Sequence, residues 1–136
     1  MGIQQYEVHL VRQADGIRTV ARVRDFSIVL GAHRGDASAG FNAVETLLSA
    51  AGACLTSSLN MVAELSGVRL LDLEVDVSAT RQDKPPTLTE IRYAIRVRTE
   101  ADEQRLARLL SLAERNSTVV STLRLSIPVS GEISKI

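Results

Sequence analysis

Apolar and polar residues alternate along the first thirty positions of the chain, which is the period of half-buried β-strands. In the run that begins at Tyr6, apolar side chains stand at every second position, and Ala14-Asp15-Gly16 then supplies a turn. A second run over 17–23 places apolar and small side chains on one face and arginines on the other, and a third run spans 26–30. We therefore expect a small three-stranded meander.

The period becomes helical at Ala43 and stays so to about Ser66, where Gly67 provides a stop signal. Asn42 as N-cap, with Glu45 three residues later, forms a variant of the capping box that begins a helix. About 24 residues give a helix of about 36 Å. The radius of gyration expected for 136 residues is only about 14 Å, so this helix crosses the whole domain.

This helix is apolar around most of its circumference, with the small residues Ala-Ala-Gly-Ala at 50–53 in its middle. Its large apolar residues are Val44, Leu47, Leu48, Leu55, Leu59, Val62 and Leu65. A helix that is hydrophobic nearly all round must be buried on nearly all sides, and one small sheet covers one side only. Glu45, Asn60 and Glu64 argue against a membrane span. We therefore expect an obligate homodimer, in which a second subunit covers the remaining face.

Two further strands are predicted over 71–79 and 91–97, where apolar residues alternate without a break. The loop Asp83-Lys84-Pro85-Pro86 separates them, so they are expected to form an antiparallel hairpin. The acidic face of the first strand would oppose the arginine face of the second.

The last part of the chain is predicted to contain a helix over about 100–115, capped by Thr99. Asn116-Ser117 is a new cap signal before a short helix at 118–123, and 127–133 is predicted to close the chain as a strand. The element order βββ-α-ββ-α-α-β indicates a single α+β domain over 1–136, with antiparallel sheets around one long buried helix.

The composition of the chain argues against several classes of function. The chain has 16 basic and 16 acidic residues and no net charge, which argues against nucleic-acid binding. One cysteine excludes an internal disulfide, and two histidines are too few for a structural zinc site. No nucleotide-binding fingerprint or signal peptide is present. We expect a cytoplasmic protein with no metal, cofactor, nucleic-acid or membrane partner.

Cys54 and Glu45 are the candidate site residues. Cys54 is the one soft nucleophile of the chain, but cysteine is also among the most buried residue types, so it can equally be a small hydrophobe of the core. In the middle of a helix its thiol gains nothing from a helix N-terminus, so its reactivity would require an arginine from elsewhere. Glu45 can serve as N3 of the capping box alone. On a straight helix, nine residues leave the two side chains on opposite faces.

The segment 44–54, Val-Glu-Thr-Leu-Leu-Ser-Ala-Ala-Gly-Ala-Cys, resembles the signature helix of the OsmC/Ohr family of osmotically inducible and organic-hydroperoxide-resistance proteins. The segment 112–123 resembles the second site of that family, and Ile127-Pro128-Val129 its final strand. The resemblance spans essentially the whole chain. It implies an α+β fold in an intertwined homodimer with two active sites at the interface.

Active members of that family reduce organic hydroperoxides with a peroxidatic cysteine, which Cys54 matches, activated by an arginine and by a glutamate that Glu45 matches. Several family positions differ here. The second, disulfide-forming cysteine is replaced within Asn116-Ser117-Thr118, so the disulfide mechanism does not carry over. Ala14 stands where the arginine is expected, with Arg12 and Arg18 near enough to substitute.

Two interpretations remain open at this point. In the first, Cys54 is a one-cysteine, thiol-dependent peroxidase that an organic hydroperoxide oxidises to a sulfenic acid and an external thiol recycles. In the second, the protein is a non-catalytic stress protein whose dimer binds a small apolar ligand, and Cys54 is structural. The sequence specifies neither the substrate nor the reductant.

Overall fold

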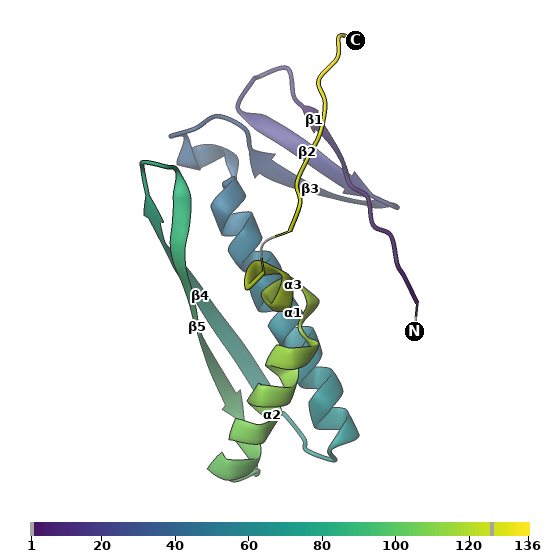
Figure 1. Ribbon diagram of the computed structural model, residues 1–136, viewed down its shortest axis with the longest axis vertical. Helices are drawn as coiled ribbons and strands as arrows, with labels where there is room; N and C mark the ends of the chain where they lie inside the picture. Colours follow the sequence, from purple (N-terminus) through teal and green to yellow (C-terminus); the bar gives the residue numbers. More distant parts are fainter. Residues whose placement is uncertain (1, 126) are drawn as a thin grey trace. The chain divides into compact units, whose positions relative to one another are not determined.

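The computed structural model describes residues 2–125 and 127–136 and shows an α+β fold with two antiparallel sheets and one long helix (Figure 1). Its elements are β1 (His9–Arg12), β2 (Arg18–Val23), β3 (Phe26–Gly31), a 3-10 helix η1 (Ala37–Ala39), α1 (Ala43–Leu65), β4 (Asp72–Gln82), β5 (Thr87–Arg98), α2 (Glu103–Asn116) and α3 (Thr118–Leu123). They form two compact units, Met1–Leu48 and Ser49–Ile136, with the boundary inside α1. The predicted fold class is confirmed.

The first unit contains the predicted meander, in the antiparallel order β1-β2-β3. Pairing brings Leu10, Ala21 and Ile28 to one face of the sheet, in a register that runs through all three strands. In the β1–β2 turn, Asp15 Oδ1 accepts hydrogen bonds from the backbone N–H groups of Ile17 (3.0 Å) and Arg18 (3.1 Å). Strand β1 begins three residues later than the alternation from Tyr6 suggests.

Helix α1 begins at the predicted capping box. The Asn42 side chain accepts a hydrogen bond from the Glu45 backbone N–H (2.8 Å), and the Glu45 carboxylate accepts one from the Asn42 N–H (2.9 Å). At the other end Gly67 adopts a φ of 69°, which is the left-handed conformation that closes a helix. Both predicted ends of the helix are therefore confirmed to within a residue.

By length and composition alone, α1 could cross a membrane. A core helix of a soluble protein passes the same test, and α1 supplies several side chains to the core of the second unit. Its buried residues are Ala51, Leu55, Ser58, Leu59, Val62 and Ala63.

In the second unit, β4 and β5 form the predicted hairpin, and its exposed face carries the predicted pairing of acids with arginines. The Arg96 guanidinium contacts both Glu74 (2.7 Å) and Asp76 (2.6 Å), and Arg98 contacts Asp72 (3.1 Å). The carboxylate of Glu74, followed by that of Asp76, raises the pKa of Arg96. The apolar residues of both strands lie on the opposite, half-buried face.

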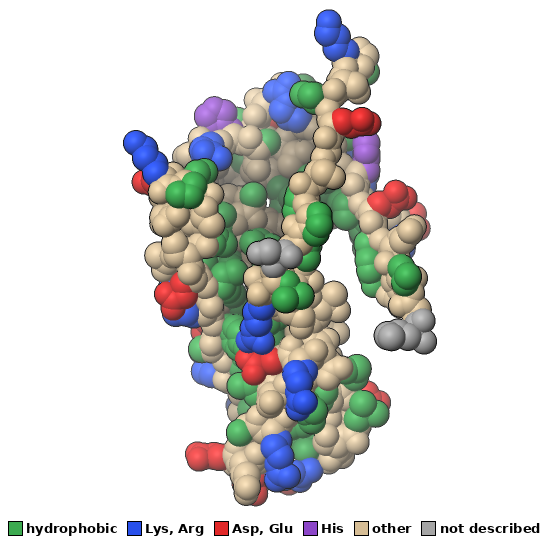
Figure 2. Space-filling model, viewed as in Figure 1, with side chains coloured by type: hydrophobic (Ala, Val, Ile, Leu, Met, Phe, Trp, Pro, Cys, Tyr) green, Lys and Arg blue, Asp and Glu red, His purple; other side chains and the backbone are tan. Residues whose placement is uncertain are grey.

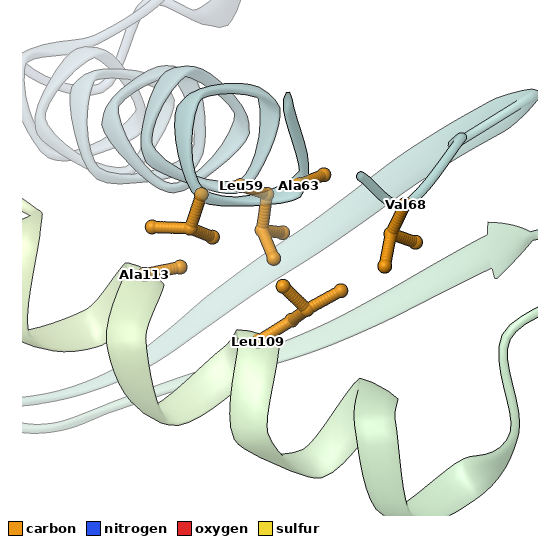
Figure 3. Close-up of a cluster of buried hydrophobic side chains, with 6 residues drawn as sticks. Leu59, Ala63, Val68, Leu109 and Ala113 are labelled. Atoms are coloured by element: carbon orange, nitrogen blue, oxygen red, sulfur yellow. The ribbon is translucent and has the colours of Figure 1, made fainter. Parts of the chain in front are cut away.

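The main core lies between α1, α2 and the hairpin (Figure 3). It contains Leu59, Val62, Ala63, Val68, Leu109 and Ala113, with Leu73 and Ile95 of the hairpin packed against it. A second cluster, which we call the upper cluster, consists of Ala51, Leu55 and Val120, with Val75, Tyr93 and Val119 packed against it. Together the two clusters attach one face of α1 to the hairpin, α2 and α3.

Two predictions about the last part of the chain are wrong. Helix α2 begins at Glu103 rather than 100, because Asp102 provides the N-cap by accepting the Arg105 N–H (2.8 Å). The Thr99 hydroxyl instead donates to the carbonyl oxygen of Arg69 (2.8 Å). The strand expected over 127–133 is not formed, since no neighbouring strand pairs with residues 127–136 and a strand needs such a partner for its backbone groups.

Candidate functional site

Cys54 lies in the middle of α1, at the border between the buried and the exposed sides of the helix. Its side chain is half-buried and the thiol is free. Leu55, the next residue, is completely buried, as is Ala51 one turn earlier, whereas Ala53 is exposed. The thiol is therefore neither locked inside the core nor fully in solvent.

The upper cluster packs against one face of this part of α1. Val120 of α3, Val75 of β4 and Tyr93 of β5 pack with Ala51 and Leu55. Three elements far apart in sequence thus fix the segment of α1 that carries Cys54. This arrangement gives the thiol a rigid support, which a reactive group needs in order to be held in a productive geometry.

Glu45 belongs to the first unit and lies in the first turn of α1, where its carboxylate completes the capping box with Asn42. This position beside the helix N-terminus is favourable for a carboxylate. Glu45 and Cys54 thus belong to different compact units.

The two arginines near the first turn have different surroundings. Arg18 forms an ion pair with Asp15 (3.4 Å) on the surface of the turn. Arg12 lies over the same turn, since a Cβ atom on Gly16 would be 3.3 Å from Arg12 Nη1. In the described part of the chain, Arg12 has no carboxylate within ion-pair distance. Arg12 is therefore the arginine of this turn whose charge is not already neutralised.

Asn116 and Ser117, where the family resemblance implies a second cysteine, face different surroundings. Asn116 is exposed, and its side-chain amide donates to the Leu112 carbonyl oxygen (2.8 Å) on its own helix. Ser117 is completely buried and caps α3, with its hydroxyl accepting the Val120 N–H (3.4 Å). Ser117 is thus the inward-facing member of this pair.

Sequence analysis missed a polar cluster at the junction of β5, α2 and α3. The Tyr93 hydroxyl donates to the Glu114 carboxylate, and Arg124 approaches both groups at 3.4 Å. Because a half-buried tyrosine hydroxyl needs a polar partner, the inward position of Tyr93 on its strand was a usable signal. Which acid would meet it depended on the docking of α2, which the sequence pattern does not give.

Among residues 2–125 and 127–136, no three His, Cys, Asp or Glu side chains come together as they would around a metal ion.

Comparison with known proteins identifies the family to which this fold belongs. The family model described as OsmC-like protein matches residues 35–132. The chain belongs to this family. The match includes α1 with Glu45 and Cys54, the hairpin, and both C-terminal helices. No curated protein matches the chain in a sequence comparison.

Solved structures of OsmC-like proteins share the fold over nearly the whole chain. The OsmC-like protein from Mycoplasma pneumoniae has 22% identity and a TM-score of 0.82, covering 89% of this chain and 88% of its own. OhrB, the organic hydroperoxide resistance protein of Bacillus subtilis, has 19% identity and a TM-score of 0.58, covering 88% and 91%. The organic hydroperoxide resistance protein OsmC from Legionella pneumophila has 13% identity and a TM-score of 0.66, covering 90% and 92%. At these identities the likeness establishes the fold.

Proposed function

We propose that this OsmC-like protein reduces organic hydroperoxides through Cys54 alone, with an external thiol as reductant. The observation that carries the proposal is the position of Cys54, half-buried on a firmly supported helix within the span that matches the family. The resemblance of segment 44–54 to the family's signature helix implies that Cys54 is the peroxidatic cysteine. Structural neighbours named as hydroperoxide resistance proteins, two of them as organic hydroperoxide resistance proteins, support the class of substrate.

The proposed reaction has two halves. The Cys54 thiolate attacks the terminal oxygen of the hydroperoxide ROOH, the O–O bond breaks, and the alkoxide takes a proton to leave as ROH, so that Cys54 becomes a sulfenic acid. One external thiol condenses with the sulfenic acid to release water and form a mixed disulfide. A second thiol then displaces Cys54 as the thiolate and leaves as a disulfide. A cytoplasmic location would supply such thiols in reduced form.

Arg12 and Glu45 are the side chains we propose to act on the thiol or the peroxide. A guanidinium beside the sulfur would favour the thiolate. Arg12 suits this role better than Arg18, because Asp15 already pairs with Arg18. That an arginine and Glu45 both act on Cys54 is what the resemblance to the family implies for the assembled protein.

We propose that this assembly is a homodimer. The chain exposes 11068 Å², whereas a folded monomer of 14.7 kDa exposes about 6900 Å². Even two separate folded domains of half that mass would expose only about 8400 Å². Hydrophobic side chains reach the surface on the face seen in Figure 2, and in the first unit Leu10, Phe26 and Ile28 are all more than half exposed. A second copy would cover such surface, and light scattering showing a folded monomer at micromolar concentration would contradict this.

A non-catalytic, ligand-binding dimer is the second candidate function. The observation that favours it is the buried Ser117 cap at the second-cysteine position, which leaves Cys54 without a disulfide partner in its own chain. In that case Cys54 would contribute only packing, and the dimer would bind a small apolar molecule.

The deciding experiment measures sulfenic-acid formation at Cys54 by mass spectrometry after addition of cumene hydroperoxide, alongside thiol-dependent turnover. We expect oxidation faster than that of a free thiol at the same pH, and none in Cys54→Ser. Glu45→Gln and Arg12→Gln should slow it, whereas Glu64→Gln on the same helix and Arg18→Gln in the same turn serve as matched controls. A native Cys54 that resists both hydroperoxide and thiol reagents would instead support the ligand-binding function.

A further inference from the structure

A cavity of about 380 Å³ lies in the second unit, where α1 ends and α2 begins. The loop after α1 and the loop between β5 and α2 form its walls, with Arg105 of α2 beside them. Leu65, the last residue of α1, is eleven positions beyond Cys54, which corresponds to about 16 Å along the helix. The cavity is therefore separate from the proposed Cys54 site.

Two arginines line this cavity. Arg105 is held in place because its Nη2 donates to the carbonyl oxygen of Ser66 (3.2 Å). A guanidinium has five N–H donors, so most of those of Arg105 remain available. The backbone of Arg69 is fixed by the hydroxyl of Thr99. In the described chain, the Arg69 side chain has no carboxylate within ion-pair distance.

The acidic groups nearby do not neutralise this pair. Glu100 is the one acid among the lining residues, and neither arginine forms an ion pair with it in the part of the chain that the structure describes. The Asp102 carboxylate is occupied in capping α2, where it accepts the Arg105 N–H. Glu64 lines an adjoining hollow that shares Arg69. The lining itself thus has an excess of positive charge.

The cavity also has room for a ligand beside these cations. A Cβ atom on Gly67, one of the lining residues, would meet nothing within 4 Å, so the space beside Gly67 is open. Val68 next to it is buried in the core and gives the cavity a rigid floor. Basic side chains, in blue, gather around α2 in Figure 2. A guanidinium fork matches the paired oxygens of a carboxylate or a phosphate.

We propose that this cavity binds the carboxylate or phosphate group of a small molecule between the guanidinium groups of Arg69 and Arg105. The two arginines are the specificity-determining residues. Their planar donors supply hydrogen bonds as well as charge, so a lysine at either position would keep the charge but lose the paired contact.

The test is a titration of the ¹⁵N-labelled full chain with sodium phosphate and, separately, sodium acetate at constant ionic strength. We expect saturable shifts of the amide signals of Arg69, Glu100 and Ala101 with at least one of the two anions, and the stronger one identifies the class of ligand. Arg69→Gln should weaken binding about tenfold, the loss typical of one charge-assisted contact. Arg105→Lys should also weaken it, although it retains a cation that can reach Ser66.

Arg98→Gln is the matched control, since Arg98 is an exposed arginine of the neighbouring strand whose side chain pairs with Asp72 outside this cavity. It should bind both anions like the unaltered protein. Shifts that do not saturate, that sodium chloride reproduces, or that persist unchanged in Arg69→Gln and Arg105→Lys would overturn the proposal.

Discussion

Gly52 of α1 lies directly against Val77 of β4, so closely that a Cβ atom on residue 52 would come within 3.2 Å of Val77 Cγ2. The same atom would lie 3.9 Å from Val75 Cγ1. Helix and hairpin can approach this closely because residue 52 has no side chain. Within the small residues 50–53 of α1, Gly52 is therefore the position against which the hairpin of the same chain packs.

Gly52→Val should therefore destabilise the protein by about 1–3 kcal/mol, because the added methyl groups would overpack the contact with Val77. Urea unfolding followed by circular dichroism measures the change. Val77→Ala combined with Gly52→Val should recover part of the loss, since it removes the methyl groups in the way. Losses that simply add in the double variant would show that the two residues are not in contact.

Asn42→Ala should lower the free energy of unfolding by about 1 kcal/mol, because it removes the side chain that caps the first turn of α1. Asn42→Ser should retain most of the stability, since serine is also a favoured N-cap. Glu45→Gln should keep the fold, because glutamine can complete the box. Thermal unfolding of the three variants is the measurement, and equal stability of the alanine and serine variants would contradict the capping role.

Ser117→Cys should form a disulfide with Cys54 under mild oxidation, whereas Asn116→Cys should keep both thiols free. The reason is orientation: Ser117 is completely buried, while Asn116 is exposed and bonded to its own helix. Helix α3, which Ser117 caps, packs through Val120 on Ala51 and Leu55 of the helical turn that carries Cys54. A thiol count and mass spectrometry of linked peptides provide the result. A bridge in Asn116→Cys but not in Ser117→Cys would reverse this assignment.

The loop before η1 should show a pH dependence caused by Asp36. Hydrogen bonds from the side chain and backbone of Ser38 lower the pKa of Asp36 below its ordinary value of 3.8. Because the folded pKa is the lower one, the ionised cap stabilises the loop above pH 3.8 and this stabilisation is lost as the pH falls through the folded pKa. An NMR titration of the Asp36 carboxyl should show this, and Ser38→Ala should raise the midpoint. An unchanged midpoint in Ser38→Ala would contradict the assigned cause.

Most of the secondary structure was predictable because its signals are local. The capping box of Asn42 and Glu45, the stop at Gly67 and the two alternating strands of the hairpin each depend on residues close in sequence. The start of α2 was missed because Thr99 and Asp102 are both good N-caps. Which of them caps the helix is decided by a tertiary contact, the bond from Thr99 to the Arg69 carbonyl oxygen.

For the candidate site, the sequence predicts which residues take part but not how exposed they are or what they contact. Cys54 and Glu45 stand out by chemistry and by the family resemblance, but the sequence pattern does not reveal whether a helix residue is half-exposed. The choice between Arg12 and Arg18 required the ion pair with Asp15, and the choice between Asn116 and Ser117 required their burial. The ion pair depends on the conformation of one turn and the burial of Ser117 on packing between elements, and hydrophobic periodicity encodes neither.

The charged outer face of the β4–β5 hairpin has a consequence for solubility. These strands have 11 and 12 residues, about twice the usual length, and within the described residues each has one edge without a neighbouring strand. Long open edges invite association with the edges of other chains. The exposed face between these edges carries Arg96 paired with Glu74 and Asp76, and the register of β4 with β5 shifts at Thr80–Arg81. Charged side chains beside an open edge oppose the association of strands from other chains, so we expect this charged face to favour solubility.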